Sequence, residues 1–310
     1  MSDTLLTLGE VTTDRVVDFP TQRPQVPTSA RERPSEADSA EILNFPTHAN
    51  PSARMLPRCD LETVIAAIAE SRIETLFQRQ VDLRSGEVVA VEALARLRDA
   101  RGALLDTATA IEQAEIHDVI GVLGRRVAER ALYELAQHQL AGLRVPRIAL
   151  NVSPLELCDP GYNVWLLSLL DDLKITSEQV ELELTERTCR DWTTVQLQNL
   201  DVLAAQGVTL VLDDFGVGFS NWDQLKALPI SGIKLDPSLT FDIERCRTSA
   251  RIVAGLRQVA DDLDLRLVIE GVESHTQLSV LRSLNCRQGQ GFLFGRPAPL
   301  ALLLNDPSEA

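Results

Sequence analysis

The hydrophobic positions from about residue 59 onward follow two different spacings. Short apolar runs of strand length are separated by longer stretches in which apolar residues recur every three or four positions, the spacing of an amphipathic helix. The clearest helical stretches cover residues 61–70, 121–140 and 249–265. The strand-like runs cover residues 74–83, 87–97, 147–153, 179–186, 208–216, 231–236, 265–273 and 288–295.

This alternation predicts the fold class. Eight strands with helices between them, in roughly 250 residues, favour a TIM-like (β/α)8 barrel over an open α/β sheet. The first two strands are an exception, because only residues 84–87 separate them. A parallel connection needs about a dozen residues or more. We therefore expect an antiparallel hairpin here, and a barrel that is atypical at its first strand.

Residues 1–58 have a different character. They hold seven of the fifteen prolines, many Ser, Thr, Glu and Arg residues, and no sustained periodicity. This composition predicts a disordered tail (1–58) in front of a barrel domain (59–310). Two elements in the tail share a pattern, VVDFPT at 16–21 and ILNFPT at 42–47. They are either chance in a biased composition or a duplicated motif for the hydrophobic groove of a protein partner.

Charge and cysteine content exclude several classes of function. A net charge of −15 disfavours a DNA or RNA polymer and an anionic membrane as partners. No apolar run reaches the roughly 18 residues of a membrane span, and the N-terminus has no signal-peptide pattern, so we expect a cytoplasmic protein. The five cysteines are scattered and never form a CxxC pair, which argues against a disulfide framework and against structural zinc.

Polar residues cluster at the ends of the predicted strands. Any one of them alone is more typical of a cap or a turn than of a ligand. In a parallel barrel, however, these ends meet on the face where barrel active sites are found. Capping does not explain acids or amides on five strands and a lysine on another. The residues are Glu92, Asn151, Glu183, Glu186, Asp213, Asp214, Lys234, Glu270 and Glu273.

The chemistry of this set indicates metal ions. All the candidate ligands are oxygens, which select hard cations such as Mg²⁺ or Mn²⁺. Asp213 and Asp214 are adjacent and can serve two ions. Two metals about 3.5 to 4 Å apart stabilise the attacking and leaving oxygens in the cleavage of a phosphate ester.

A series of motifs then resembles the EAL-domain family of cyclic di-GMP phosphodiesterases. The resemblance covers about residues 72–300 and is specific because the motifs occur in order. They are FQ (77–78), EALAR (92–96), LNVS (150–153), ELTE (183–186), DDFGVGFS (213–220), IKLD (233–236), EGVE (270–273) and QGQGFLFGRP (288–297).

The resemblance implies a two-metal enzyme that opens cyclic di-GMP to linear pGpG. Lys234 resembles the group that orients or deprotonates the attacking water, and Glu92, Glu273 and Glu186 resemble further catalytic residues, with Glu186 holding the loop at 215–221. The residues similar to substrate contacts are Gln78, Arg96, Asp236 and Gln290. Those similar to metal ligands are Glu92, Asn151, Glu183, Asp213, Asp214 and Glu270.

The chain also departs from the family pattern. The usual Phe/Tyr-Gln-Pro-Ile of the first strand continues here with Arg79 and Gln80, and Val217, Phe219 and Pro237 replace common residues. These departures concern loop control, guanine contacts and the geometry of a homodimer, which the resemblance allows, more than metal binding.

Two other classes of function stay open. A catalytically silent cyclic di-GMP receptor usually lacks metal or base residues, and none is missing here. The other alternative is a protein-interaction module in which the tail is the main functional element. The DFG tripeptide at 214–216 is also found in protein kinases, but the other kinase motifs are absent.

Overall fold

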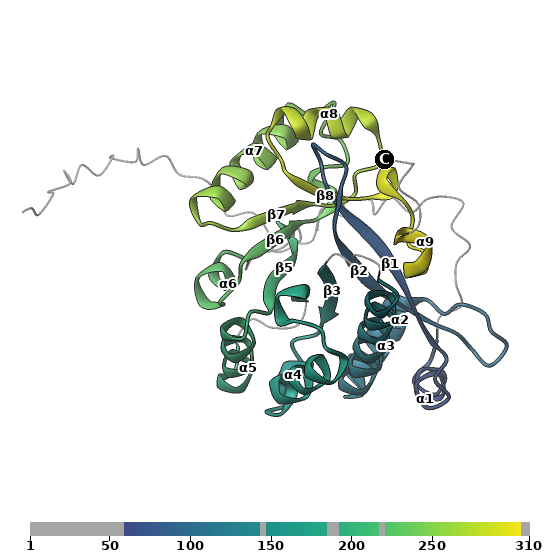
Figure 1. Ribbon diagram of the computed structural model, residues 1–310. Helices are drawn as coiled ribbons and strands as arrows, with labels where there is room; N and C mark the ends of the chain where they lie inside the picture. Colours follow the sequence, from purple (N-terminus) through teal and green to yellow (C-terminus); the bar gives the residue numbers. More distant parts are fainter. Residues whose placement is uncertain (1–58, 143–146, 185–191, 217–220, 305–310) are drawn as a thin grey trace, which may run out of the picture. The chain divides into compact units, whose positions relative to one another are not determined.

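The computed structural model describes residues 59–142, 147–184, 192–216 and 221–304. Its strands form a closed barrel in the order β1 to β8 (Figure 1). The strands are β1 (Ile73–Asp82), β2 (Val88–Leu97), β3 (Arg147–Val152), β4 (Val180–Leu184), β5 (Thr209–Phe215), β6 (Gly232–Leu235), β7 (Arg266–Ile269) and β8 (Gln288–Gln290). The α-helices are α1 (Leu61–Ala69), α2 (Thr107–Ile116), α3 (Ile120–Leu140), α4 (Tyr162–Leu173), α5 (Thr194–Ala205), α6 (Asn221–Ala227), α7 (Arg247–Asp262), α8 (His275–Ser283) and α9 (Leu300–Leu304). Short 3₁₀ helices lie at η1 (Glu156–Cys158), η2 (Ser177–Gln179), η4 (Pro237–Leu239) and η5 (Phe292–Phe294).

The first strand is the irregular one, as the short connection predicts. β1 pairs antiparallel with both β2 and β8, whereas the strands from β2 to β8 are all parallel to one another. In the register of the hairpin, Gln78 lies opposite Glu92. The predicted (β/α)8 barrel with an antiparallel first strand is confirmed.

The last strand is shorter than its apolar run suggests. The predicted strand covered residues 288–295, but β8 ends at Gln290 and Phe292–Phe294 form a 3₁₀ turn. Gly291 explains the difference, because a Cβ at this position would lie 2.1 Å from the carbonyl oxygen of Val272. The backbone at Gly291 contacts the backbone at Val272 with no side chain between them, and the chain leaves the β8 strand pairing at this contact.

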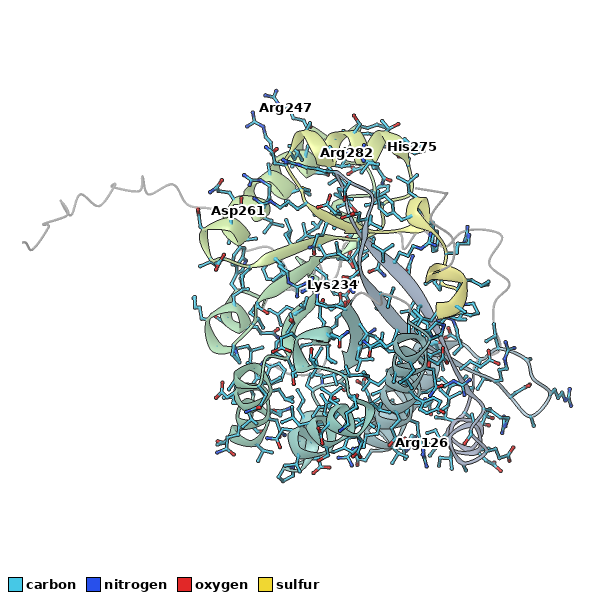
Figure 2. The ribbon with its side chains drawn as sticks, viewed as in Figure 1. Arg126, Lys234, Arg247, Asp261, His275 and Arg282 are labelled. Carbon is cyan, nitrogen blue, oxygen red and sulfur yellow. The ribbon has the colours of Figure 1, made fainter. Side chains whose placement is uncertain are left out.

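Two hydrophobic cores stabilise the described domain. The larger lies between the barrel and its outer helices and contains the outward-facing residues of the strands, such as Leu182 and Ile233. The smaller core joins α1, α2 and the start of α3 to the first residue of β1, Ile73, and the last of β2, Leu97. Figure 2 shows Lys234 inside the barrel, in contrast to charged residues on the outer helices such as Arg126 of α3.

Local capping explains where several helices begin. The carboxylate of Asp60 accepts a hydrogen bond from the backbone N–H of Thr63 at the start of α1. Ser274 and Gln277 form a capping box at the start of α8. Such caps satisfy backbone N–H groups that have no partner within the helix. They fix the residue at which each of these helices begins.

The barrel interior is polar one layer away from its carboxyl end. Glu181 of β4 is fully buried, and its Oε2 accepts a hydrogen bond of 2.7 Å from Nη2 of Arg266 of β7. Gly232 of β6 leaves room for this arginine, because an added Cβ there would lie 3.3 Å from the Cβ of Arg266. We call this contact the Glu181–Arg266 pair.

Some expectations concern parts of the chain that the structure does not describe. The tail at 1–58, with its two FPT elements, falls outside the described residues, and so does Glu186. Within the described ranges, no helix is long and apolar enough to cross a membrane.

Candidate functional site

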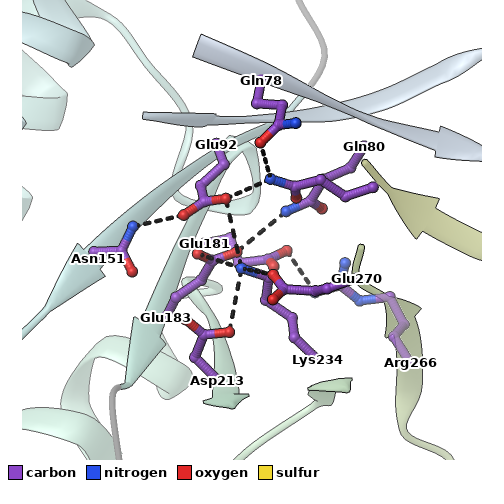
Figure 3. Close-up of polar contacts among 11 residues, drawn as sticks. Gln78, Gln80, Glu92, Asn151, Glu181, Glu183, Asp213, Lys234, Arg266 and Glu270 are labelled. Atoms are coloured by element: carbon purple, nitrogen blue, oxygen red, sulfur yellow. Dashed lines mark hydrogen bonds and ion pairs between the residues drawn. The ribbon is translucent and has the colours of Figure 1, made fainter. Parts of the chain in front are cut away.

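One lysine lies at the centre of the carboxyl end of the barrel. Lys234 is buried, with 1 % of its side chain exposed, and its Nζ faces carboxylates from four different strands (Figure 3). The distances from Nζ are 2.7 Å to Glu270 Oε1, 2.9 Å to Glu183 Oε2, 3.3 Å to Asp213 Oδ1 and 3.6 Å to Glu92 Oε2. We call these five residues the Lys234 cluster.

Strand alternation places these side chains inside the barrel. In β6, Lys234 lies between Ile233 and Leu235, and both of these face the helices and belong to the large core. In β4, Glu183 alternates in the same way with Leu182 and Leu184. Because neighbouring residues of a strand point to opposite faces, an apolar outer set leaves the polar set pointing inward.

Amide side chains hold Glu92. Its Oε1 accepts a hydrogen bond of 2.8 Å from Asn151, and its Oε2 accepts one of 2.6 Å from Gln290 (Figure 3). The same Gln290 amide group donates to Gln78 Oε1 at 3.0 Å, and Gln78 donates to the carbonyl oxygen of Gly295. Asn151 of β3 and Gln290 of β8 thus hold Glu92 directly, and Gln78 of β1 contacts Gln290.

The two adjacent aspartates share one side of β5 because the strand is irregular there. The register between β5 and β6 shifts between Leu212 and Phe215, and Asp214 has a φ of 52°. Such a left-handed residue breaks the alternation that would send neighbouring side chains to opposite faces. As a result, carboxylate oxygens of Asp213, Asp214 and Glu270 lie within 4.8 Å of one another.

Burial and charge act against each other in the Lys234 cluster. Burial alone would lower the pKa of Lys234, but the carboxylates around it, Asp213 first, hold this pKa well above its usual value. Burial raises the pKa of Glu183 well above its usual value and that of Glu270 to about 8, although Lys234 opposes both shifts. Burial also acts on Glu92, but Lys234 and the amide donors outweigh it and lower this pKa. A single lysine therefore does not offset the cost of burying the carboxylates of Glu183 and Glu270.

This donor set fits divalent cations. All of its candidate ligand atoms are carboxylate or amide oxygens, which hard ions such as Mg²⁺ prefer. Two buried oxygens, Asp213 Oδ1 and Glu183 Oε2, face Lys234 as ion pairs but accept no hydrogen bond within the described part of the chain. Four carboxylates surround one ammonium group, so further positive charge would be stabilised at this site.

The motifs and the barrel together decide the family. The sequence model of the EAL domain matches residues 62–297. This chain belongs to the EAL domain family.

Its EAL domain is 34% identical over 249 residues to cyclic di-GMP phosphodiesterase NbdA of Pseudomonas aeruginosa, covering 78% of this chain and 31% of that protein. It is 31% identical over 236 residues to oxygen sensor protein DosP of Escherichia coli, covering 75% of this chain and 29% of that protein. The chain thus spans less than half the length of these relatives.

Solved EAL domains have the same fold. The PaMucR phosphodiesterase in complex with c-di-GMP superposes with a TM-score of 0.72 at 30% identity, covering 79% of this chain and 99% of that one. The EAL enzyme Bd1971, in a form with cAMP and cyclic di-GMP bound, gives a TM-score of 0.73 at 26% identity, covering 79% of this chain and 67% of that one.

The remaining predicted site residues of this EAL domain lie at different distances from the Lys234 cluster. Arg96 is on the same face of β2 as Glu92, is half-buried, and donates to the carbonyl oxygen of Ala95 at 2.7 Å. Burial lowers the pKa of Arg96, and Glu92 opposes this shift. Asp236 directly follows β6, where its carboxylate caps a 3₁₀ turn. Glu273 is exposed, and among the described residues no hydrogen bond or ion pair links its side chain to the cluster.

One residue of the EAL domain that contacts the cluster was not among the predicted site residues. Gln80 donates from Nε2 to Glu183 Oε1 at 3.1 Å. In the sequence, Gln80 stands out only as a departure from the family pattern. The alternation of side chains along a strand could have identified Gln80 as a site residue, because it lies two residues after Gln78 and therefore on the same face.

Proposed function

We propose that this EAL domain is a two-metal phosphodiesterase that hydrolyses cyclic di-GMP to linear pGpG with Mg²⁺ or Mn²⁺. One observation carries the proposal: a single buried lysine faces four carboxylates from four strands at the end of the barrel where active sites form. Relatives named as cyclic di-GMP phosphodiesterases and a related phosphodiesterase in complex with c-di-GMP support the choice of substrate.

The proposed metal ligands are oxygen donors from five strands: Glu92, Asn151, Glu183, Asp213, Asp214 and Glu270. When bound, two divalent cations supply electrostatic stabilisation for the charge that develops on the phosphate oxygens. The protein holds its donors ready for them. Asn151 uses its Nδ2 on Glu92, which leaves its Oδ1 for a cation.

Lys234 is the proposed group that orients the attacking water. Its ammonium group is held in place by Glu270 at 2.7 Å and Glu183 at 2.9 Å, so it presents its N–H bonds from a fixed position. A fixed donor lowers the cost of aligning the water with the phosphorus atom. No protein nucleophile is required.

The proposed substrate contacts line the same end of the barrel. Arg96 offers a guanidinium group, which matches the geometry of a phosphate, two positions beyond Leu94 on the inner face of β2. Gln290 holds Glu92, and Gln78 accepts a hydrogen bond from Gln290; both are proposed to border the scissile phosphate. Asp236, Glu273 and Glu186 keep their proposed roles as a substrate contact, a water-shell residue and a support of the loop at 215–221.

The test is to incubate the purified protein with cyclic di-GMP and either Mg²⁺ or Mn²⁺ and to follow the products by chromatography. We expect linear pGpG, no turnover in EDTA, and loss of turnover in Glu92→Ala. Glu87→Ala is the matched control, because Glu87 is exposed in the turn before β2. Wild-type turnover in Glu92→Ala would contradict the metal assignment. Binding of cyclic di-GMP without hydrolysis by the wild-type protein would instead identify a receptor.

The organisation around the barrel remains a proposal. We propose that residues 1–58 are dispensable for the chemistry and that Phe19 and Phe45 bind a protein partner. Hydrolysis by a 59–310 fragment, and the proteins that co-purify with Phe19→Ala/Phe45→Ala, test these two points. The cytoplasmic location, the homodimer and the absence of a DNA or RNA partner stay predictions.

A further inference from the structure

The carboxylate of Glu183 faces two different partners. Its Oε1 accepts the hydrogen bond from Gln80 Nε2 at 3.1 Å, and its Oε2 lies 2.9 Å from Lys234 Nζ (Figure 3). Both Gln80 and Glu183 are completely buried. An amide from β1 therefore occupies one oxygen of this carboxylate, and the other oxygen points to the centre of the Lys234 cluster.

The strands fix Gln80 in this position. β1 pairs with its neighbours so that Gln80 lies opposite Ala90 of β2 and opposite Gln290 of β8. Ala90 is small and fully buried, which leaves space inside the barrel for the longer side chain. The NH₂ group of Gln80 faces Glu183 and donates the hydrogen bond to Oε1.

Gln80 completes a set of amides that hold the glutamates of the cluster. Asn151 and Gln290 each donate to one oxygen of Glu92, as Gln80 donates to one oxygen of Glu183. Partners of this kind orient metal ligands, and their loss typically lowers metal affinity about 10- to 100-fold. Gln80 reaches the cluster from β1 and is not itself among the proposed ligands.

We propose that Gln80 is a positioning residue that restricts Glu183 to one ligand oxygen and thereby makes the site select Mg²⁺ and Mn²⁺ against Ca²⁺. This inference rests on the proposed metal site. Ca²⁺ takes roughly six to eight oxygens and often binds both oxygens of a carboxylate, whereas Mg²⁺ demands an octahedron. Because Gln80 uses one lone pair of Oε1 and holds that oxygen toward β1, Oε2 is the oxygen that Glu183 presents to the centre of the cluster, which suits the smaller coordination number.

The test compares metal affinities without substrate. Calorimetric titrations of the full chain with Mg²⁺, Mn²⁺ and Ca²⁺ are made for the wild-type protein and for Gln80→Met, which keeps the length of the side chain but cannot donate. We expect Mg²⁺ to bind Gln80→Met about tenfold more weakly than the wild type, because losing a group that orients a metal ligand typically lowers metal affinity by at least this factor. Ca²⁺ should bind it as tightly as the wild type or more tightly.

Gln288→Met is the matched control. Gln288 faces the barrel interior two residues before Gln290 on β8, and we have placed it in no catalytic or binding role. The ratio of Ca²⁺ to Mg²⁺ affinity should stay at the wild-type value in this variant. If Gln80→Met does not fold, Gln80→Asn replaces it, because its amide is one methylene shorter and should shift the same ratio.

The outcomes separate this inference from the proposed function. An unchanged Ca²⁺ to Mg²⁺ ratio in the Gln80 variant, or an equal shift in Gln288→Met, would overturn the role of Gln80. A protein that binds Mg²⁺ with the expected selectivity but does not hydrolyse cyclic di-GMP would leave the role of Gln80 standing and remove the phosphodiesterase. A wild-type protein that binds no divalent cation would overturn both.

Discussion

The interior of the barrel buries charge at two levels, and the two levels are built differently. At the carboxyl end, Lys234 faces four carboxylates. One layer deeper, Glu181 accepts a hydrogen bond of 2.7 Å from Arg266, and the charge of Arg147 acts on both of them. Buried charges are tolerated when they are paired, and an unpaired excess has to be neutralised by something else. We therefore expect the level of Glu181 and Arg266 to be structural and the level of Lys234 to be the one that binds cations.

Replacing Lys234 should have the largest effect. Lys234→Ala removes the group that we propose orients the attacking water, so we expect kcat to fall by about 10²- to 10⁴-fold and KM to change much less. The metal-free variant should also melt at a lower temperature, because the carboxylates lose their cation, and Mn²⁺ should restore part of the loss. Steady-state kinetics and thermal melts with and without metal measure both effects.

Lys226→Ala is the control for this variant, because Lys226 is exposed on α6 and pairs with Asp223 at the surface. It should match the wild type in both measurements. A rise in KM with unchanged kcat in Lys234→Ala would make Lys234 a binding residue instead.

Breaking the Glu181–Arg266 pair should affect stability and leave the chemistry unchanged. Arg266→Met removes the hydrogen-bonded cation of the fully buried Glu181 and leaves only the nearby Arg147, so we expect a loss of up to about 3 to 5 kcal/mol of unfolding free energy. The double variant Glu181→Leu/Arg266→Met removes both charges and should recover most of that loss. Urea denaturation measures the stability, and kcat below the unfolding transition should equal that of the wild type. A loss of kcat comparable to that of Lys234→Ala would show that the two levels are not separate.

A third buried acid gives a smaller, pH-dependent effect. Glu156 is 5 % exposed and accepts a hydrogen bond of 3.0 Å from the backbone N–H of Ser153. It packs against α3 so closely that a Cβ on Gly124 would lie 1.9 Å from Glu156 Oε2. Burial raises its pKa to about 8, although the backbone hydrogen bond and the nearby Arg125 lower it. The folded protein thus retains a proton here that the unfolded chain has already lost.

The sign of the effect follows from this difference. The contribution of protonated Glu156 is complete below its unfolded pKa, near 4.5, and is lost as the pH rises through about 8. Between these values, stability should fall by at most about 1.4 kcal/mol per pH unit. Glu156→Gln should flatten this part of the profile in urea titrations at pH 5 to 8.5, and the exposed Glu112→Gln should not. A wild-type slope in Glu156→Gln would assign the dependence to other groups.

The sequence predicts the barrel and most of the site because both depend on the order of polar and apolar residues along each strand. Strand alternation brings Glu92, Glu183 and Lys234 to the inner face, and parallel strands bring their ends together. The convergence of Asp213 with Asp214 also depends on a break in the alternation, which no apolar pattern encodes.

The contacts that the sequence did not predict are those between distant strands. Glu181 and Arg266 are 85 positions apart, and Gln80 and Glu183 are 103 positions apart. Each pair depends on barrel register and on small neighbours such as Gly232 and Ala90, so its partners are identified only once the strands are aligned.

The reversed direction of β1 determines where the polypeptide enters the domain. Ile73, the first residue of β1, pairs with Leu97 at the carboxyl end of β2, and α1 packs beside them in the smaller core. A parallel first strand would have admitted the chain at the opposite end. The strand that follows α1 is the one that carries Gln78 and Gln80. The N-terminal side of the described domain therefore lies at the same end of the barrel as the Lys234 cluster, and a single strand connects the two.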